Sequence, residues 1–333
     1  MSYEPRFSIS PELLALVADI SALRERIQGA AVELSWVPAL QKDTRTRNGH
    51  ASTAIEGNPL TLEQVRALEE GREIVASKQR FKREVTNYFA GLRYVEKQAN
   101  LKEVRHEHLF ELHRLLADEV MDQGRAGAYR TIGVKVGDHF PPHPDDVSPL
   151  MLELLDWWNT RAQELSPILS SAILHYRFEY IHPFADGNGR TGRALGLWEL
   201  YRRGFDSHHI FSVDEYYWED RPTYYASLCQ VRLAGEDLSQ WLEYCAKGLK
   251  QTLEQVWLRI EQIESVGLEK VFLTPRQERL LGLLRDHGSL APSEIWSLLD
   301  MSRQGAMKVI NPLLKAGMIE KRGTAKSGRY FLS

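Results

Sequence analysis

The sequence has little cysteine and no long apolar run. Cys229 and Cys245 are the only cysteines among 333 residues and suggest buried thiols more than a disulfide, and the eleven histidines are too scattered to support a Cys/His metal site. No apolar run reaches the roughly 20 residues that span a bilayer, and residues 1–11 lack the basic and apolar regions of a signal peptide. We therefore expect a cytoplasmic protein with buried thiols and no membrane partner.

Two common phosphate-binding patterns are also missing. The chain contains neither Gly-x4-Gly-Lys-Ser/Thr nor Gly-x-Gly-x-x-Gly, and it shows no tandem repeat or low-complexity tract. Any nucleotide site must therefore be built in another way.

Length and charge suggest more than one module. A chain of 333 residues can hold two or three domains. Residues 270–333 carry eleven Lys and Arg against five Asp and Glu, whereas the whole chain has a net charge of −3. This basic segment after an acidic body indicates a separate C-terminal module.

Apolar residues recur with helical spacing through most of the chain before residue 180. The expected helices cover residues 11–28, 61–75, 81–99, 107–120, 150–165 and 167–180. Thr61 and Gln64 form a capping box at the start of the second, and His175 is expected to be a core residue. The spacing predicts a mainly α fold, a helical bundle that buries its site between facing helices. Around Gly137-Asp138, alternating β-branched residues predict a small β-hairpin, with an exposed loop as the alternative.

Residues 182–193 read His-Pro-Phe-Ala-Asp-Gly-Asn-Gly-Arg-Thr-Gly-Arg. Glycines at 187 and 189 let the backbone turn its N–H groups toward one point, which makes an anion site at a helix start. Arg190 and Arg193 share a face of the first turn of a helix expected over about 191–204, where cations oppose the helix dipole unless an anion lies between them.

The same stretch holds a base and a metal ligand. His182 can accept a proton near pH 7, and Asp186 is an oxygen ligand suited to Mg²⁺ carried by phosphates. A lone His before Pro is usually structural and Gly-Asn-Gly is usually a turn, but the combination predicts a polyphosphate held beside a proton acceptor.

This stretch resembles the Fic family signature, His-x-Phe-x-Asp/Glu-Gly-Asn-Gly-Arg-x-x-Arg, at every fixed position. The resemblance implies a protein adenylyltransferase, a nucleotidyltransferase that moves AMP from ATP to a Ser, Thr or Tyr hydroxyl of a target protein or of itself. It implies His182 as the general base, Asp186 as the Mg²⁺ ligand and Arg193 as the γ-phosphate ligand, while Arg190 neutralises leaving-group charge. The implied nucleotide-binding residues are Asp186, Gly187, Asn188, Gly189, Arg190, Thr191, Gly192, Arg193, Tyr224 and Tyr225.

Tyr224 and Tyr225 match, by their spacing from Arg193, a Tyr pair that lines the adenine and ribose pocket in related proteins, although packing in the aromatic core is an equal alternative. The chain has Gly235-Glu236-Asp237 where family members often carry Gly-Asp-Trp, a departure at the outer edge of the base pocket. In the family a hairpin flap beside the site pairs with the backbone of the target. The flap surface would consist of Val134, Lys135, Val136, His139 and Phe140.

Residues 52–58, Ser-Thr-Ala-Ile-Glu-Gly-Asn, resemble the Fic inhibitory motif Ser/Thr-x-x-x-Glu-Gly/Asn through Ser52 and Glu56. Taken alone, they indicate a solvated Glu before a helix stop. The resemblance implies that Glu56 pairs with Arg193 and competes with the γ-phosphate, as in the class with an N-terminal inhibitory helix.

The C-terminal segment resembles a winged helix-turn-helix, with helices expected near 275–287, 292–299 and 303–316 and a wing over 318–332. Arg303 and Lys308 would project from the recognition helix toward DNA phosphates. Pro312 should kink that helix. Winged helices also dock proteins or form homodimers, and these alternatives stay open.

We therefore expect an N-terminal helical region over 1–105, a Fic catalytic core over 106–250, and a linker helix with a winged-helix domain over 251–333. The leading function is an autoinhibited adenylyltransferase. Two others remain: the same fold could remove AMP or use another phosphorylated donor, or it could be a DNA-binding regulator whose Fic body senses a ligand.

Overall fold

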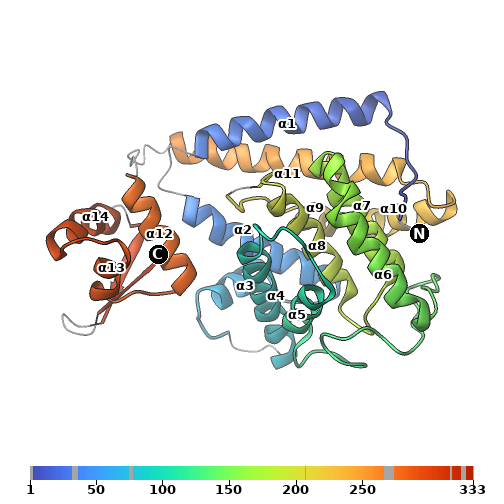
Figure 1. The fold of residues 1–333 in the computed structure, drawn as a ribbon, viewed down its shortest axis with the longest axis horizontal. Helices are drawn as coiled ribbons and strands as arrows, with labels where there is room; N and C mark the ends of the chain where they lie inside the picture. The colour runs from blue at the N-terminus through green and yellow to red at the C-terminus, as the bar shows by residue number, and fades with distance from the viewer. Residues whose placement is uncertain are drawn as a thin grey trace. The chain divides into compact units, whose positions relative to one another are not determined.

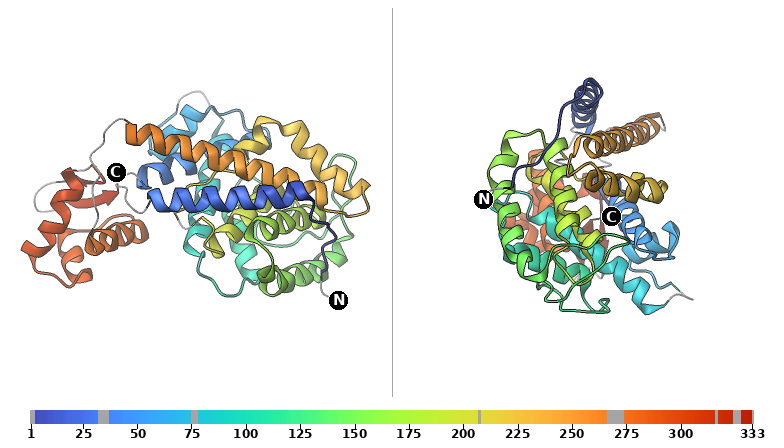
Figure 2. Two further views of the ribbon diagram at one scale, coloured as in Figure 1. Left: turned by 90° about the horizontal axis from the view of Figure 1, so that it is seen from above. Right: turned by 90° about the vertical axis from the view of Figure 1, so that its right-hand side faces the viewer.

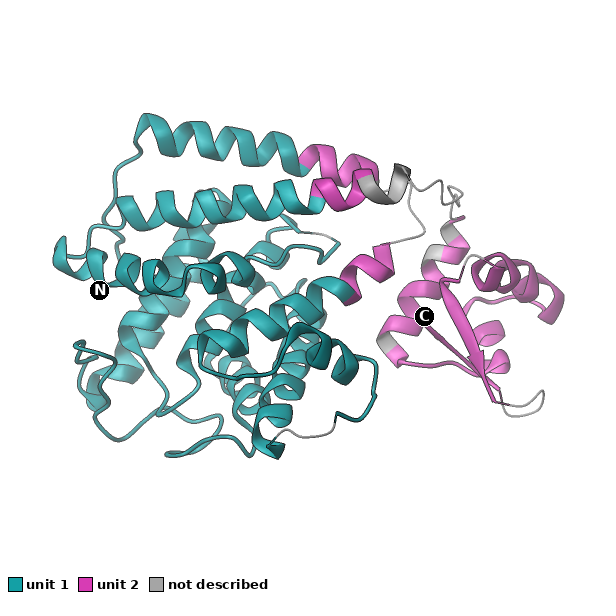
Figure 3. Cartoon of the chain, turned by 180° about the vertical axis from the view of Figure 1, so that it is seen from behind, with its two compact units in different colours: residues 1–24, 43–256 teal, residues 25–42, 257–333 magenta. Residues whose placement is uncertain are grey.

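The computed structural model describes residues 3–31, 37–74, 78–206, 208–265, 274–315, 317–323 and 328–332. The chain forms two compact units, one from residues 1–24 and 43–256 and the other from residues 25–42 and 257–333 (Figure 3).

Helices follow one another through the first 265 residues (Figure 1). They are α1 (Pro11–Ala31), α2 (Val37–Ile55), α3 (Leu62–Glu69), α4 (Gln79–Lys97), α5 (His106–Ala117), α6 (Pro144–Asn159), the 3₁₀ helix η1 (Arg161–Glu164), α7 (Pro167–Ile181), α8 (Asn188–Arg202), α9 (Asp214–Glu219), α10 (Arg221–Leu233) and α11 (Ser239–Ser265).

The helix that follows the signature, α8, lies inside the first unit against α7, α4 and α5. Nearly every residue of α8 is buried, from Asn188 to Tyr201, including the charged side chains of Arg190, Arg193 and Glu199. Fully buried tryptophans on α6, α8 and α11 fill the space around it, Trp157, Trp158, Trp198 and Trp241. The start of α8 is thus fixed by a packed core.

Helices α1 and α11 run side by side and in the same direction, as Figures 1 and 2 show. Within the first unit, Glu12 pairs with Lys247 at 2.7 Å and Asp19 with Lys250 at 2.6 Å. These exposed ion pairs add little stability. The pairing depends mainly on apolar contacts, because Leu13 and Ile20 on α1 are fully buried.

The second unit contains the winged helix. Its elements are α12 (Pro275–His287), α13 (Pro292–Leu298), α14 (Arg303–Lys315), β1 (Ile319–Arg322) and β2 (Arg329–Leu332). Strands β1 and β2 are antiparallel, with Ile319 opposite Leu332, and Leu290 adds a bridge to Tyr330. Buried residues of the three helices and β1 form one core. The predicted mainly α fold with a C-terminal winged helix is confirmed.

Several predicted boundaries were displaced. The helix expected over 61–75 ends at Glu69, before Gly71 with its φ of 70°, and residue 75 lies outside the described ranges. The one expected over 150–165 starts at Pro144. Helix α14 continues through Pro312 to Lys315. Within the described ranges, no helix is both long and apolar enough to span a membrane.

Candidate active site

The signature loop connects α7 to α8, and an aromatic stack holds it. Phe184 is fully buried, and its ring lies on that of His113 from α5, with centroids 3.6 Å apart and planes 5° from parallel. Nδ1 of His113 accepts a hydrogen bond from the Gly127 amide at 2.9 Å, so Nε2 carries the hydrogen and donates to the Asp186 carbonyl at 2.9 Å. Burial lowers the pKa of His113 to about 4, which keeps this bridge neutral.

Two signature side chains, those of Asn188 and Thr191, hold the loop in place from within. The amide side chain of Asn188 accepts from Phe184 N at 2.9 Å and donates to Phe184 O at 2.8 Å. The Thr191 hydroxyl donates to Gly187 O at 2.8 Å, and Gly187 has a φ of 76°. The side chains of Asn188 and Thr191 are buried, and their hydrogen bonds are made within the loop and the first turn of α8.

Arg193 and the end of α2 meet at the start of α8. Arg193 donates from Nη2 to the Glu56 carboxylate at 2.7 Å. It also donates from Nε to the Ser52 hydroxyl at 2.8 Å and from Nη2 to the Ser52 carbonyl at 2.9 Å. Although burial by itself lowers the pKa of Arg193, the negative charge of Glu56 and its neighbours raises it well above its usual value. The guanidinium is therefore a fixed cation.

The Glu56 carboxylate also covers the anion site itself. A Cβ at Gly189, in the first turn of α8, would run into Oε1 of Glu56 and would lie 3.2 Å from Nη1 of Arg193. Glu56 thus places a negative charge at the N-terminus of α8, where the helix dipole favours an anion.

A second acid lies behind Arg193. Asp214 opens α9 and accepts a hydrogen bond of 2.7 Å from the Tyr88 hydroxyl, and both groups act electrostatically on Arg193. Tyr224 is also buried here, with its hydroxyl 3.1 Å from Nε2 of His175. Tyr225 is 39% exposed, under the Arg221 guanidinium. Of the two predicted base-binding tyrosines, only Tyr225 presents an exposed ring.

Asp186 and Arg190 lie on the other side of the loop. Arg190 is buried, with Nη1 at 3.4 Å from the Leu116 carbonyl and Nη2 at 4.0 Å from Oδ1 of Asp186. The Arg190 and Arg193 side chains therefore contact different groups. The Asp186 carboxylate is 32% exposed and accepts from the Gly187 amide at 2.6 Å.

His182 ends α7 in a left-handed conformation, with φ 50° and ψ 60°. Its backbone amide donates to the Phe178 carbonyl at 2.8 Å. Its Nδ1 lies 3.6 Å from Oε2 of Glu179, one helical turn earlier. Sequence reasoning missed both Glu179 and His113; an acid three positions before the histidine was the only signal for the first.

The expected flap is present as one antiparallel bridge, Val136 to His139, closed by Gly137 and Asp138. Val136 is 36% and Phe140 71% exposed. Lys135 is also exposed, and Val134 is half-buried. The hairpin prediction thus holds only at its tip.

Arg130 connects the flap segment to the backbone at His182. Its guanidinium donates to the carbonyls of Ile132 at 3.0 Å and Pro142 at 2.5 Å, at the two ends of the flap. It also donates to the His182 carbonyl at 2.8 Å, and its amide donates to Pro183 O at 2.9 Å. One guanidinium therefore fixes the position of the flap relative to the backbone of His182.

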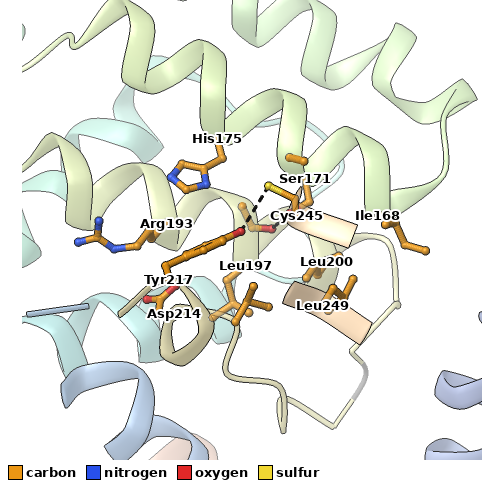
Figure 4. Close-up of a pocket in the computed structure, with 13 residues that line it drawn as sticks. Ile168, Ser171, His175, Arg193, Leu197, Leu200, Asp214, Tyr217, Cys245 and Leu249 are labelled. Atoms are coloured by element: carbon orange, nitrogen blue, oxygen red, sulfur yellow. Dashed lines mark hydrogen bonds between the residues drawn. The ribbon is translucent and has the colours of Figure 1, made fainter. Parts of the chain in front are cut away.

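A pocket lies behind Arg193, between α7, α8, α9 and α11, with about 450 Å³ of unfilled space that includes open solvent. Figure 4 shows Arg193, His175 and Asp214 at its polar end and Leu200, Leu249 and Ile168 at its apolar end. The Tyr217 hydroxyl and Cys245 Sγ lie 3.6 Å apart between them.

The Fic/DOC family model matches residues 103–200, and the MarR family model matches residues 273–329. The chain is 33% identical over 233 residues to the protein adenylyltransferase Fic of Nematostella vectensis, covering 69% of this chain and 52% of that protein. It is 35% identical over 209 residues to the protein adenylyltransferase fic-1 of Caenorhabditis elegans, covering 61% of this chain and 39% of that protein. The chain thus spans about half or less of these relatives.

Two solved structures are similar. A Fic family protein from Desulfovibrio desulfuricans G20 is 29% identical with a TM-score of 0.69, over 99% of this chain and 98% of that one. Fic-1 of C. elegans, residues 134–508, is 29% identical with a TM-score of 0.60, over 73% of this chain and 70% of that one.

Proposed function

We propose that the chain is a protein adenylyltransferase of the Fic/DOC family, whose model matches residues 103–200. The observation that supports this most strongly is the position of Arg193. This buried cation lies near the N-terminus of α8, directly after the signature loop, and it already pairs with an anion, Glu56. Relatives that match most of this chain carry that name, and ATP would be the AMP donor.

In the proposed reaction, His182 accepts the proton of a target hydroxyl as its oxygen bonds to the α-phosphorus of ATP. The bond from that phosphorus to the bridging oxygen breaks, and pyrophosphate leaves with its electron pair. The amides at the start of α8 and Arg190 would stabilise the charge that develops on the phosphates. A positioned base contributes about 10²–10⁴-fold in rate.

Mg²⁺ would fit this site through one carboxylate, Asp186, together with the phosphates of the nucleotide. Among the described residues, no group of three or more His, Cys, Asp or Glu could hold a metal. A partly exposed carboxylate such as Asp186 suits Mg²⁺, which binds one or two carboxylates together with phosphate oxygens and water. Bound there, the ion would neutralise phosphate charge.

We also propose that Glu56 inhibits the reaction. Its carboxylate and the γ-phosphate would compete for Nη2 of Arg193 and for the space over Gly189. Each tenfold of repression requires only about 1.4 kcal/mol of such competition.

Transfer from α-³²P-ATP to lysate proteins tests the proposal. We expect Glu56→Gly to increase labelling and His182→Ala, added to Glu56→Gly, to abolish it. The added protein should not raise labelling from γ-³²P-ATP above that of the lysate alone, because the γ-phosphate leaves with pyrophosphate; a rise would show phosphoryl transfer instead. A silent Glu56→Gly variant, together with AMP removal that requires Glu56, would favour hydrolysis of AMP from the modified protein by a water that Glu56 positions.

A second activity, DNA binding, is favoured by helix α14. Its sequence contains no acidic residue, and its exposed polar side chains are Arg303, Gln304, Lys308, Asn311 and Lys315. Such side chains can contact phosphates and base edges in a major groove.

Fluorescence anisotropy with duplex DNA at several salt concentrations tests this role. We expect Arg303→Glu with Lys308→Glu to weaken binding and flatten the salt dependence, and Lys102→Glu in the catalytic unit to change neither. Equal binding by all three proteins would assign the winged helix to a protein partner or to a second copy.

A further inference from the structure

Glu179 and His182 face each other at the end of α7. Glu179 lies in the last turn of α7, and His182 follows three residues later at the left-handed C-cap of that helix. Oε2 of Glu179 lies 3.6 Å from Nδ1 of His182, and the two side chains are only 13% and 15% exposed. The distance is just beyond a normal hydrogen bond, so a small rotation of either side chain would form one.

Both side chains have buried polar atoms without partners. Among the described residues, none makes a hydrogen bond with Nδ1 of His182 or with Oε1 of Glu179. Buried polar groups are nearly always paired, and unpaired ones are found where function requires them. A buried carboxylate beside the base is costly to maintain, so a role in positioning or charge stabilisation would explain its presence.

The neighbours of Glu179 favour its ionised form. Burial by itself would raise the pKa of Glu179, but His182, His175 and Arg193 together hold it below its usual range. Space for the carboxylate depends on Gly192, because a Cβ there would run into Oε1 of Glu179. Gly192 therefore contacts this acid as well as belonging to the signature.

We propose that Glu179 is a positioning residue that holds His182 with Nδ1–H toward its carboxylate and Nε2 free to accept a proton. This inference rests on the proposed adenylyl transfer. As the target oxygen bonds to the α-phosphorus and pyrophosphate departs, Nε2 gains the hydroxyl proton and the ring becomes a cation. The Glu179 carboxylate pairs with that cation and is not itself protonated.

Other charged groups around His182 cannot replace Glu179 in this role. Arg130 bonds the backbone carbonyl of His182, not its ring. On the flap, the ring of His139 lies near enough to interact electrostatically with His182, but the carbonyl 3.3 Å from its Nε2 is that of Tyr180. Arg193 and His175 interact electrostatically with Glu179, the acid of the pair, and lower its pKa. Glu179 is thus the anion that faces the imidazole ring.

Imidazole ¹⁵N chemical shifts of the wild-type protein test the orientation directly. The His182 signals are assigned by their loss in His182→Ala. At a pH where the ring is neutral, we expect the tautomer with hydrogen on Nδ1. The opposite tautomer would overturn the proposal, and this result requires neither activity nor a variant of Glu179.

Kinetics in the Glu56→Gly background give a second test. Glu179→Gln offers an N–H to Nδ1 and favours the wrong tautomer, so we expect kcat to fall about 10²-fold or more. KM for ATP should stay within about threefold. The acid limb of the pH–rate profile should move to lower pH, because a base without an adjacent carboxylate is weaker. Glu179→Asp should recover part of kcat.

Glu199→Gln is the matched control. Glu199 is a buried carboxylate of α8 that accepts from the Trp158 indole and the Ser170 hydroxyl, both at 2.6 Å. Its variant should lower Tm without moving the pH profile. A Glu179→Gln variant with unchanged kcat and acid limb would refute the proposal. Absence of all transfer by Glu56→Gly itself would instead count against the proposed function, and the tautomer would still decide the role of Glu179.

Discussion

Ser52 accepts two hydrogen bonds from the guanidinium of Arg193, one through its hydroxyl and one through its backbone carbonyl. Ser52 is fully buried, whereas the Glu56 side chain is 37% exposed. The contact between α2 and Arg193 therefore has an inner part that is held by the core and an outer part that another anion can replace.

The two parts should respond differently to substitution. In Glu56→Gly, Arg193 stays oriented by Ser52, so we expect ATP to bind at least about tenfold more tightly by calorimetry. Glu56→Gln keeps the size and removes the charge, and it should give most of this gain. Ser52→Ala in the Glu56→Gly background should reverse part of it and lower stability by about 1–3 kcal/mol. Equal ATP affinity in wild type and Glu56→Gly would contradict the competition.

Gly189→Ala should weaken nucleotide binding. The added methyl group would lie over the first turn of α8, where it meets the Glu56 carboxylate and where a phosphate would bind. We expect at least a tenfold loss of ATP affinity in the Glu56→Gly background. Gly196→Ala is the control, because its Cβ would lie 3.3 Å from the Ser171 hydroxyl and away from the loop. Similar losses in both variants would indicate a general effect on α8.

Arg130→Met should uncouple target docking from catalysis. The variant removes the bonds from both ends of the flap to the His182 segment. We expect KM for the target to rise and kcat to fall, about tenfold in their ratio, while ATP affinity stays constant. Arg130→Lys keeps the charge but cannot bond all of these carbonyls, so it should restore only part of the lost kcat/KM. A change in ATP affinity as large as that in KM would show that the whole loop had moved.

Acid should destabilise the catalytic unit through two buried histidines. Burial lowers the pKa values of His113 and His175 from 6.5 to about 4. Between these values the unfolded chain binds protons that the folded chain excludes, so stability is complete above about pH 6.5 and falls as the pH drops toward 4. Each histidine contributes up to about 3 kcal/mol. Urea unfolding across this range should show a shallower pH dependence in His113→Gln; the same slope as wild type would contradict this assignment.

The sequence predicted α8 and the winged helix well because the apolar residues on which the predictions depended are buried in the folded chain. It did not predict the full length of α2. That helix buries polar side chains, so it lacks the regular spacing of apolar residues from which a buried helix is predicted. The Thr44 hydroxyl donates to Ile210 O and Asn48 bonds the Phe211 carbonyl, so its partners come from a segment more than 160 positions away.

The site was predictable where its residues adjoin in sequence. His113 lies 73 positions from the carbonyl it holds, and no local pattern could show that pairing. The shape of the flap also depends on tertiary contacts, because Arg130 fixes its ends to carbonyls that only the folded chain brings together. Asn188 shows the opposite limit. The sequence identified it as a signature residue, but it did not predict that its side chain would bond the backbone of Phe184.

The pairing of Glu56 with Arg193 is made within one chain, across 137 positions. A tethered competitor acts at a fixed effective concentration, which for flexibly linked groups is on the order of millimolar. Repression should therefore be independent of how much of the protein a cell contains. Dilution would abolish inhibition by a second molecule but would leave the proposed inhibition by Glu56 intact, whereas a higher ATP level or a change in the conformation of α2 would relieve it.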